Sequence, residues 1–239
     1  MKDKKPSYLD MSQLKGAKIQ DFHAPILRKL YRIAGVYVAE KLFEHRKITP
    51  NKVTLLSALL LLIAAYFLYI GKYPYLIFSS ILIIIAFFFD YVDGSLARFR
   101  GTGSTFGKWV DMFLGLGPFT LVILFYAATF SVFRNTGNYL VWVYGPLGLI
   151  ASLIIALIYN TFLKLHADGL KEIEIEKEKS SFLTNFYYTE FLIFNLLALA
   201  CLLNRINEFL MFCAVYGWIF LIAVFIKLTK KAYRLKRAE

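Results

Sequence analysis

The amino-acid sequence predicts an all-α membrane protein with six transmembrane helices, and three observations support this fold class. First, 59% of the 239 residues are hydrophobic and the mean hydropathy is +0.57, which is too apolar for an ordinary soluble domain. Second, apolar runs of about 20 residues, the length needed to cross a roughly 30 Å hydrocarbon core, recur along the chain. Third, the connections between these runs alternate between many and few basic residues.

The apolar runs divide the chain into two parts. The predicted spans are 53–71, 75–96, 109–133, 138–163, 186–203 and 207–228. We therefore expect a cytoplasmic or interfacial N-terminal segment over residues 1–48 and a six-helix transmembrane domain over residues 49–239.

Lysine and arginine residues are concentrated on one side of the predicted membrane domain. Twelve lie in the segment through Lys52, three in 98–108, four in 164–184 and six from Lys227 onward, whereas the other three connections hold one each. By the positive-inside rule, both termini lie in the cytoplasm of a multi-pass protein, and we expect the cell (inner) membrane as its location. Because topology and attraction to anionic lipids explain most of the net charge of +12, we expect no nucleic-acid partner.

The N-terminal segment contains one helical pattern before the first span. Residues 21–47 mix apolar and basic positions at a helical period, without a long purely apolar run. This pattern is typical of an amphipathic helix in the membrane interface, and a soluble helix next to the membrane is the alternative. The first span then begins with Thr49 as N-cap and Pro50 in the first helical turn.

Acidic residues interrupt the apolar sequence where the second span ends and the third begins. The residues around them fall on one stripe of each helix: Asp90, Asp93, Gly94, Ala97 and Arg98 on the second span, and Gly107, Asp111 and Gly115 on the third. Because charges at membrane depth are costly, they indicate a functional site by default. Two such stripes facing each other would form a cation-binding cleft, since carboxylates are the hard oxygen ligands that Mg²⁺ prefers.

Two alternative roles for these acidic residues stay open. In one, the aspartates form ion pairs with Arg98, Arg100 or Lys108 at the membrane surface, which requires neither the glycine nor the spacing. In the other, the carboxylates mark an ion path across the bilayer. An ion path fits less well, because the acidic residues crowd one end of the spans and the outer halves are apolar.

The string from Asp90 to Gly115 resembles the signature of the CDP-alcohol phosphotransferase (CDP-alcohol phosphatidyltransferase) family, Asp-x2-Asp-Gly-x2-Ala-Arg-x8-Gly-x3-Asp-x3-Asp. Every fixed position agrees except the last, where the family has a fourth aspartate and this chain has Gly115. The family also usually begins its first span with Pro-Asn-x-x-Thr, as residues 50–54 do here. The motif resemblance extends from about residue 49 to at least 118, and the six-span count carries it over the rest.

The resemblance implies an enzyme of phospholipid biosynthesis. Such an enzyme transfers a phosphatidyl or phospho-alcohol group from a CDP-linked alcohol or a donor of the CDP-diacylglycerol type to an alcohol acceptor and releases CMP. By resemblance, Asp90, Asp93 and Asp111 bind Mg²⁺ or Mn²⁺, and Asp111 is also catalytic. Contacts to the nucleotide donor are implied for Asn51, Thr54, Asp90, Asp93, Gly94, Ala97, Arg98 and Gly107. Membrane lipids are further partners, and we expect a homodimer because homodimers are common in the family.

Several of these residues also suit ordinary structural roles. Asn51 and Thr54 can simply begin a helix, and Arg98 can extend from a helix end toward water. The acceptor alcohol stays unknown. The fourth predicted span holds no cation for an anionic acceptor, and the aromatic residues 186–188 beside Glu190 fit an interfacial aromatic belt better than a pocket for an ammonium group.

Gly115 raises a specific question about activity. In the family the fourth aspartate is thought to deprotonate the acceptor alcohol and to complete a second metal site, and glycine can do neither. In one hypothesis another base, Glu190 or His166, replaces it. In a second, one metal suffices and activity is weak, since losing a general base typically costs about 10²–10⁴-fold. In a third, the protein binds CDP-lipid and metal without turnover.

Overall fold

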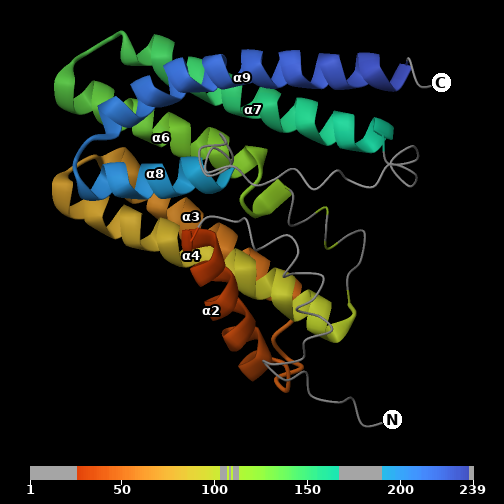
Figure 1. Ribbon diagram of the computed structural model, residues 1–239. Helices are drawn as coiled ribbons and strands as arrows, with labels where there is room; N and C mark the ends of the chain where they lie inside the picture. The colour runs from red at the N-terminus through yellow and green to blue at the C-terminus, as the bar shows by residue number, and fades with distance from the viewer. Residues whose placement is uncertain (1–25, 103–106, 108, 110–112, 167–189, 237–239) are drawn as a thin grey trace.

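The computed structural model describes residues 26–102, 107, 109, 113–166 and 190–236. Within these residues, every regular element is an α-helix (Figure 1). The helices are α2 (Ile26–Leu42), α3 (Pro50–Ile70), α4 (Tyr73–Arg100), α6 (Pro118–Thr136), α7 (Val141–His166), α8 (Glu190–Leu202) and α9 (Ile206–Lys236). The predicted all-α class is confirmed.

Five of these helices, α3, α4, α6, α7 and α9, are long and apolar enough to cross a membrane. The described part of the predicted fifth span is α8, which has 13 residues. At helical rise α8 is about 20 Å long, which is shorter than a hydrocarbon core of roughly 30 Å. The membrane fold is therefore supported by five spanning helices and one shorter apolar helix, and residues 186–189 of the predicted span lie outside the described residues.

Local sequence explains where α3 and α4 begin and end. Thr49 is the N-cap of α3, as predicted, and its side chain accepts a hydrogen bond from the Lys52 backbone N–H over 3.4 Å. Each helix ends at a glycine in the left-handed region, Gly71 (φ 71°) after α3 and Gly101 (φ 60°) after α4. Glycine suits this position because it has no Cβ to clash with the preceding turn.

The helices pack as two pairs joined by two further helices. One pair is α3 with α4, which run in opposite directions, and the other is α7 with α9, which run in the same direction (Figure 1). Between the pairs, α6 contacts both α3 and α7, and α8 contacts both α4 and α9. The shared core contains large buried side chains from five of these helices: Leu61, Leu68, Ile83, Phe125, Phe194 and Leu210. This arrangement leaves the far end of α4, which carries the acidic motif, away from the short turns.

The three short turns lie at one end of the bundle (Figure 1). The Asn135 side chain donates to the Gly71 carbonyl over 2.8 Å, and the Tyr73 hydroxyl donates to the Leu202 carbonyl over 3.1 Å. These turns correspond to the three predicted connections with a single basic residue each, although Arg134 lies in the last turn of α6. The structure thus groups the connections as the charge distribution predicted, while their assignment to the outer side stays a prediction.

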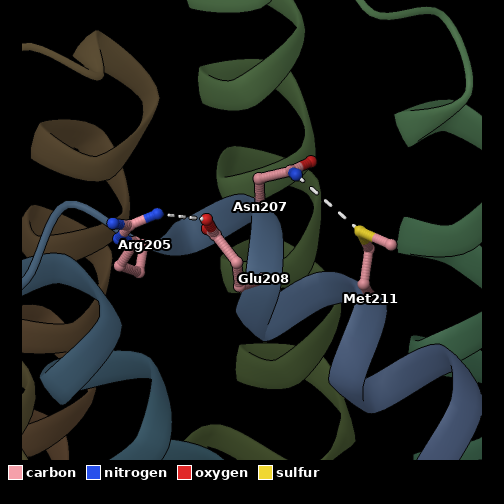
Figure 2. A network of polar contacts seen from close by, with 4 residues as sticks. All are labelled: Arg205, Asn207, Glu208 and Met211. Atoms are coloured by element: carbon pink, nitrogen blue, oxygen red, sulfur yellow. Dashed lines mark hydrogen bonds and ion pairs between the residues drawn. The ribbon is translucent and has the colours of Figure 1, made fainter.

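Several polar contacts lie at the last of these turns, between α8 and α9. Figure 2 shows the Arg205 guanidinium paired with the Glu208 carboxylate over 2.8 Å, and the Asn207 amide facing the Met211 sulfur at 3.7 Å. Asn207 also accepts a hydrogen bond from the Tyr144 hydroxyl of α7. Both members of the Arg205–Glu208 pair are exposed, so the pair contributes little to stability.

The prediction of one uninterrupted third span over residues 109–133 is wrong. The chain bends at residues 115–117, and α6 begins at Pro118. Pro118 follows two closely spaced glycines and fits the first turn of a new helix. The Thr120 hydroxyl lies within hydrogen-bond distance of two carbonyl oxygens of the bend, those of Gly115 (2.6 Å) and Gly117 (3.0 Å). Gly115 is therefore outside a helix, contrary to the predicted stripe.

The N-terminal helix ends before the predicted limit at residue 47. Its described part, α2, ends at Leu42, and the chain then turns, with the His45 N–H donating to the Leu42 carbonyl over 3.0 Å. Exposed apolar residues form one stripe of α2: Leu30, Ile33 and Tyr37, each at least 50% exposed. An exposed apolar stripe on a helix with basic neighbours is what an interfacial helix requires, and it favours that interpretation over a soluble helix.

The opposite side of α2 is packed against α4 and α8. A Cβ added to Gly35 would lie 2.9 Å from the Tyr91 Cβ, so the two backbones approach as closely as glycine allows. The Tyr31 ring stacks on Tyr91 at 5.8 Å, and its hydroxyl donates to Asn195 of α8 over 3.3 Å. Burial raises the pKa of the Tyr31 phenol, which keeps this hydroxyl protonated as a donor. The position of α2 on the bundle is therefore well defined.

Candidate functional site

The end of α4 places the predicted metal ligand Asp93 against the first turns of α3. Asp93 is 5% exposed, and its carboxylate oxygen Oδ2 accepts a hydrogen bond of 2.7 Å from the Thr54 hydroxyl. Thr54 itself is 4% exposed. Burying a carboxylate is costly unless hydrogen bonds compensate, so Thr54 fixes the orientation of Asp93 and lowers the cost of its burial.

Small polar residues bring α3 and α4 close enough for this contact. The Ser57 hydroxyl of α3 donates to the Ala86 carbonyl over 2.8 Å, and the Ser79 hydroxyl of α4 donates to the Ala64 carbonyl over 2.9 Å. All four of these residues are buried. Small side chains allow helix backbones to approach in a membrane, and hydroxyl groups then join them. The resulting pairing sets Thr54 and Asp93 at the same depth.

After Asp93, the Arg98 guanidinium lies near the helix backbone at Gly94, which has no side chain. Among the described residues, a Cβ added to Gly94 would meet only the Arg98 guanidinium, at 3.5 Å from Nη1 and 3.9 Å from Nη2. The same guanidinium donates to the Ser95 hydroxyl over 3.1 Å. Arg98 therefore folds back along its own helix toward Gly94 and Ser95, while the residue as a whole stays exposed, so an extension toward water is still possible for part of the side chain.

The structure gives the burial of three other predicted site residues and does not describe a fourth, Asp111. Asn51 is exposed in the first turn of α3, Asp90 is partly buried on α4, and Gly107 is partly buried and helical. Asp111, the predicted third metal ligand and catalytic residue, lies outside the described residues. Within the described part of the chain, no group of three or more His, Cys, Asp or Glu side chains is gathered for a metal ion.

The donor set at the end of α4 fits a hard divalent cation. Asp90 and Asp93 supply two carboxylates on one helical face, one of them oriented by Thr54. Mg²⁺ is usually bound by one or two protein carboxylates together with water and the phosphates of a substrate. Two carboxylates at this spacing match the usual protein part of such a site, while the third predicted ligand, Asp111, lies outside the described residues.

Two residues of this region have roles that the sequence does not reveal. The motif does not single out Ser95, although its position three residues before Arg98 places it on the same helical face. The sequence suggests Arg100 only as an ion-pair partner of the aspartates. In the structure its guanidinium donates to the carbonyls of Leu42, Phe43, His45 and Ile48, at 2.5 to 3.1 Å.

The two residues considered as substitute bases lie at helix ends. Glu190 is exposed in the first turn of α8, and His166 is the last residue of α7. The aromatic residues 186–188 lie outside the described residues. A substitute base therefore stays a prediction.

Sequence comparison matches residues 47–228 to the family described as CDP-alcohol phosphatidyltransferase. This chain belongs to that family. The match covers well over half of the chain and includes α3 through most of α9, so the resemblance drawn from the motif is confirmed. The family membership supports an enzyme of phospholipid biosynthesis in a membrane.

One curated relative is the archaetidylinositol phosphate synthase of Pyrococcus horikoshii. It is 38% identical over 64 residues, which correspond to 27% of this chain and 32% of the relative. The alignment thus spans about a third of that relative's length.

Proposed function

We propose that this protein is an integral membrane CDP-alcohol phosphotransferase that depends on a divalent metal. It transfers a phosphatidyl or phospho-alcohol group from a CDP-linked donor to an alcohol and releases CMP. The observation that carries the proposal is the buried Asp93 carboxylate held by Thr54, next to the open Gly94 backbone and the Arg98 guanidinium. The Asp93 carboxylate suits a metal ion, the Gly94 backbone suits a nucleotide, and the Arg98 guanidinium suits a diphosphate.

Each side chain has a separate task in this proposal. Mg²⁺ or Mn²⁺, held by Asp90, Asp93 and Asp111, would neutralise charge on the diphosphate. Thr54 orients Asp93, and Arg98 holds phosphate oxygens through its planar guanidinium. Gly94 lets the nucleotide lie against the helix. The acceptor oxygen forms a new bond to phosphorus, the bond between that phosphorus and the CMP oxygen breaks, and the acceptor proton passes to a base.

The second candidate function is binding of CDP-lipid and metal without turnover. The observation that favours it is the environment of Gly115, which is buried in the bend before α6 and lacks a carboxylate. Without that carboxylate, the base expected at this position is missing. Activity therefore has to be tested separately from binding.

The acceptor is best identified by a screen. The name of the Pyrococcus relative contains archaetidylinositol phosphate, so the screen includes phosphorylated inositol. It also includes neutral alcohols and amino alcohols, because α7 carries no charged residue between Val141 and Leu163. We further propose that both termini are cytoplasmic and that the protein is a homodimer, which cysteine labelling from either side and mass measurement in lipid nanodiscs would check.

The deciding experiment measures CMP release by the purified protein in nanodiscs with CDP-diacylglycerol or CDP-archaeol, the acceptor panel and Mg²⁺ or Mn²⁺. Metal-dependent CMP release that is lost in Asp93→Asn supports the transferase. Thermal stabilisation by CDP and Mg²⁺, lost in the same variant but without CMP release from any donor, supports the binding protein. If the protein shows neither CMP release nor thermal stabilisation, both the transferase and the binding protein are rejected.

A further inference from the structure

Arg100, the last residue of α4, holds the connection between α2 and α3. Its Nη1 group donates to the Ile48 carbonyl over 2.5 Å, and its Nη2 group donates to the carbonyls of Leu42 (2.7 Å), Phe43 (3.1 Å) and His45 (3.1 Å). The Nε group is buried and has no partner among the described residues, so the contact is made by the two Nη groups.

The accepting carbonyls lie at the end of a helix and in the turn that follows it. Leu42 ends α2, and the last carbonyls of a helix have no partner within the helix itself. A cation at this end also interacts favourably with the helix dipole. The planar guanidinium can direct several N–H groups to different carbonyls at once, which the single ammonium of a lysine does less well.

Arg100 and Thr54 join α4 to neighbouring parts of the chain at two levels: Arg100 holds the connection before α3, and Thr54 belongs to α3 itself. The Ile48 carbonyl precedes the N-cap Thr49, and Thr54 lies in the first turns of α3. On α4, Asp93 and Arg100 are seven residues apart, about 10 Å at helical rise. Next to these polar contacts, α2, α3 and α4 share a small buried cluster that contains Ala39, Val53, Val92 and Leu96. Contacts at two levels prevent the start of α3 from rotating or sliding along α4.

We infer that Arg100 is a positioning residue, which fixes the start of α3 against α4 so that Thr54 holds Asp93 in the orientation needed for metal and nucleotide. This inference rests on the proposed function, because it concerns the same site. In the part of the chain that the structure describes, the Arg100 guanidinium contacts backbone carbonyls of the α2–α3 connection, so its effect on the site is exerted through Thr54 and Asp93.

The test compares Arg100→Gln, Arg100→Lys and the control Arg205→Gln, which removes an exposed arginine from the α8–α9 turn. The rate of trypsin cleavage after the exposed Arg46 and Lys47, quantified by mass spectrometry, reports on how firmly Arg100 holds the connection between α2 and α3. The concentration of CDP that gives half-maximal thermal stabilisation in excess Mg²⁺ reports on the site. We expect the cleavage rate and the CDP midpoint to increase about tenfold in Arg100→Gln, less in Arg100→Lys, and not in the control.

Two outcomes would overturn the inference. Unchanged cleavage in Arg100→Gln means that the contacts do not hold the connection, and faster cleavage with an unchanged CDP midpoint means that Arg100 has a structural role alone. If Arg100→Gln does not fold, Arg100→Lys decides by the same two measurements. If the wild-type protein binds CDP but releases no CMP, the proposed transferase activity is rejected. A shifted CDP midpoint in Arg100→Gln would still support the positioning role of Arg100.

Discussion

Replacing Thr54 with valine tests whether its hydroxyl tunes the candidate metal ligand. Valine keeps the branched shape of threonine, so the main change is loss of the 2.7 Å hydrogen bond to the Asp93 carboxylate. Because Asp93 is 5% exposed, water cannot freely replace the lost donor. We therefore expect the carboxylate to be less well oriented for metal.

The magnitude follows from the kind of bond that is lost. A hydrogen bond to a charged group contributes about 1.5–3 kcal/mol, and a change of about 1.4 kcal/mol is tenfold in an equilibrium constant. Loss of a group that orients a metal ligand typically costs about 10–100-fold in affinity or activity. The two figures agree, so the Mg²⁺ concentration for half-maximal effect should rise about 10–100-fold in Thr54→Val.

The assay is a Mg²⁺ titration at fixed CDP, followed by thermal stabilisation and, where turnover is measurable, by CMP release. Thr129→Val is the matched control, because the Thr129 hydroxyl is similarly buried but donates to the Phe125 backbone carbonyl within α6. It should lower stability without moving the Mg²⁺ midpoint. Thr54→Ser keeps a hydroxyl and should stay near the wild type. An equal midpoint in Thr54→Val and wild type would refute a role of the hydroxyl in metal binding.

Three further changes test the rest of the site. Gly94→Ala places a methyl group at ordinary contact distance from Arg98, so the stability of the protein without ligand should be unchanged or higher. The CDP concentration for half-maximal stabilisation should rise at least about tenfold. An unchanged CDP midpoint would place the nucleotide elsewhere. Gly115→Asp should raise CMP release by up to about 10²–10⁴-fold if only the base is missing, and no gain would show that more is lost. Chelation by EDTA should abolish CDP stabilisation in the wild type and have no further effect in Asp93→Asn, and a persistent effect in the variant would argue against Asp93 as a ligand.

The sequence is most informative where chemistry and periodicity coincide. The first two spans and the end of α4 follow from long apolar runs, a capping threonine and glycines that stop helices. Family membership follows from the spacing of Asp90, Asp93 and the residues after them. These features are local, so neither needs knowledge of which helices face each other.

Features that depend on tertiary contacts could not be predicted in the same way. The bond between Thr54 and Asp93 depends on how α3 packs on α4, and the clamp by Arg100 depends on where α2 ends. The break before Pro118 is hard to recognise because apolar residues on both sides resemble one continuous span. Two glycines followed by proline are nevertheless a local signal that argues against a continuous helix.

The packing of α2 against α4 has a consequence for the depth of the acidic residues in the membrane. α4 has 28 residues and is about 42 Å long at helical rise, more than a core of roughly 30 Å, so its length alone does not fix its vertical position. α2 cannot shift independently of α4, because Gly35 of α2 lies in close contact with Tyr91 of α4. In the interfacial interpretation of α2, its exposed stripe of Leu30, Ile33 and Tyr37 would hold the carboxylates level with the lipid headgroups, where the proposed lipid donor would arrive by lateral diffusion within its leaflet.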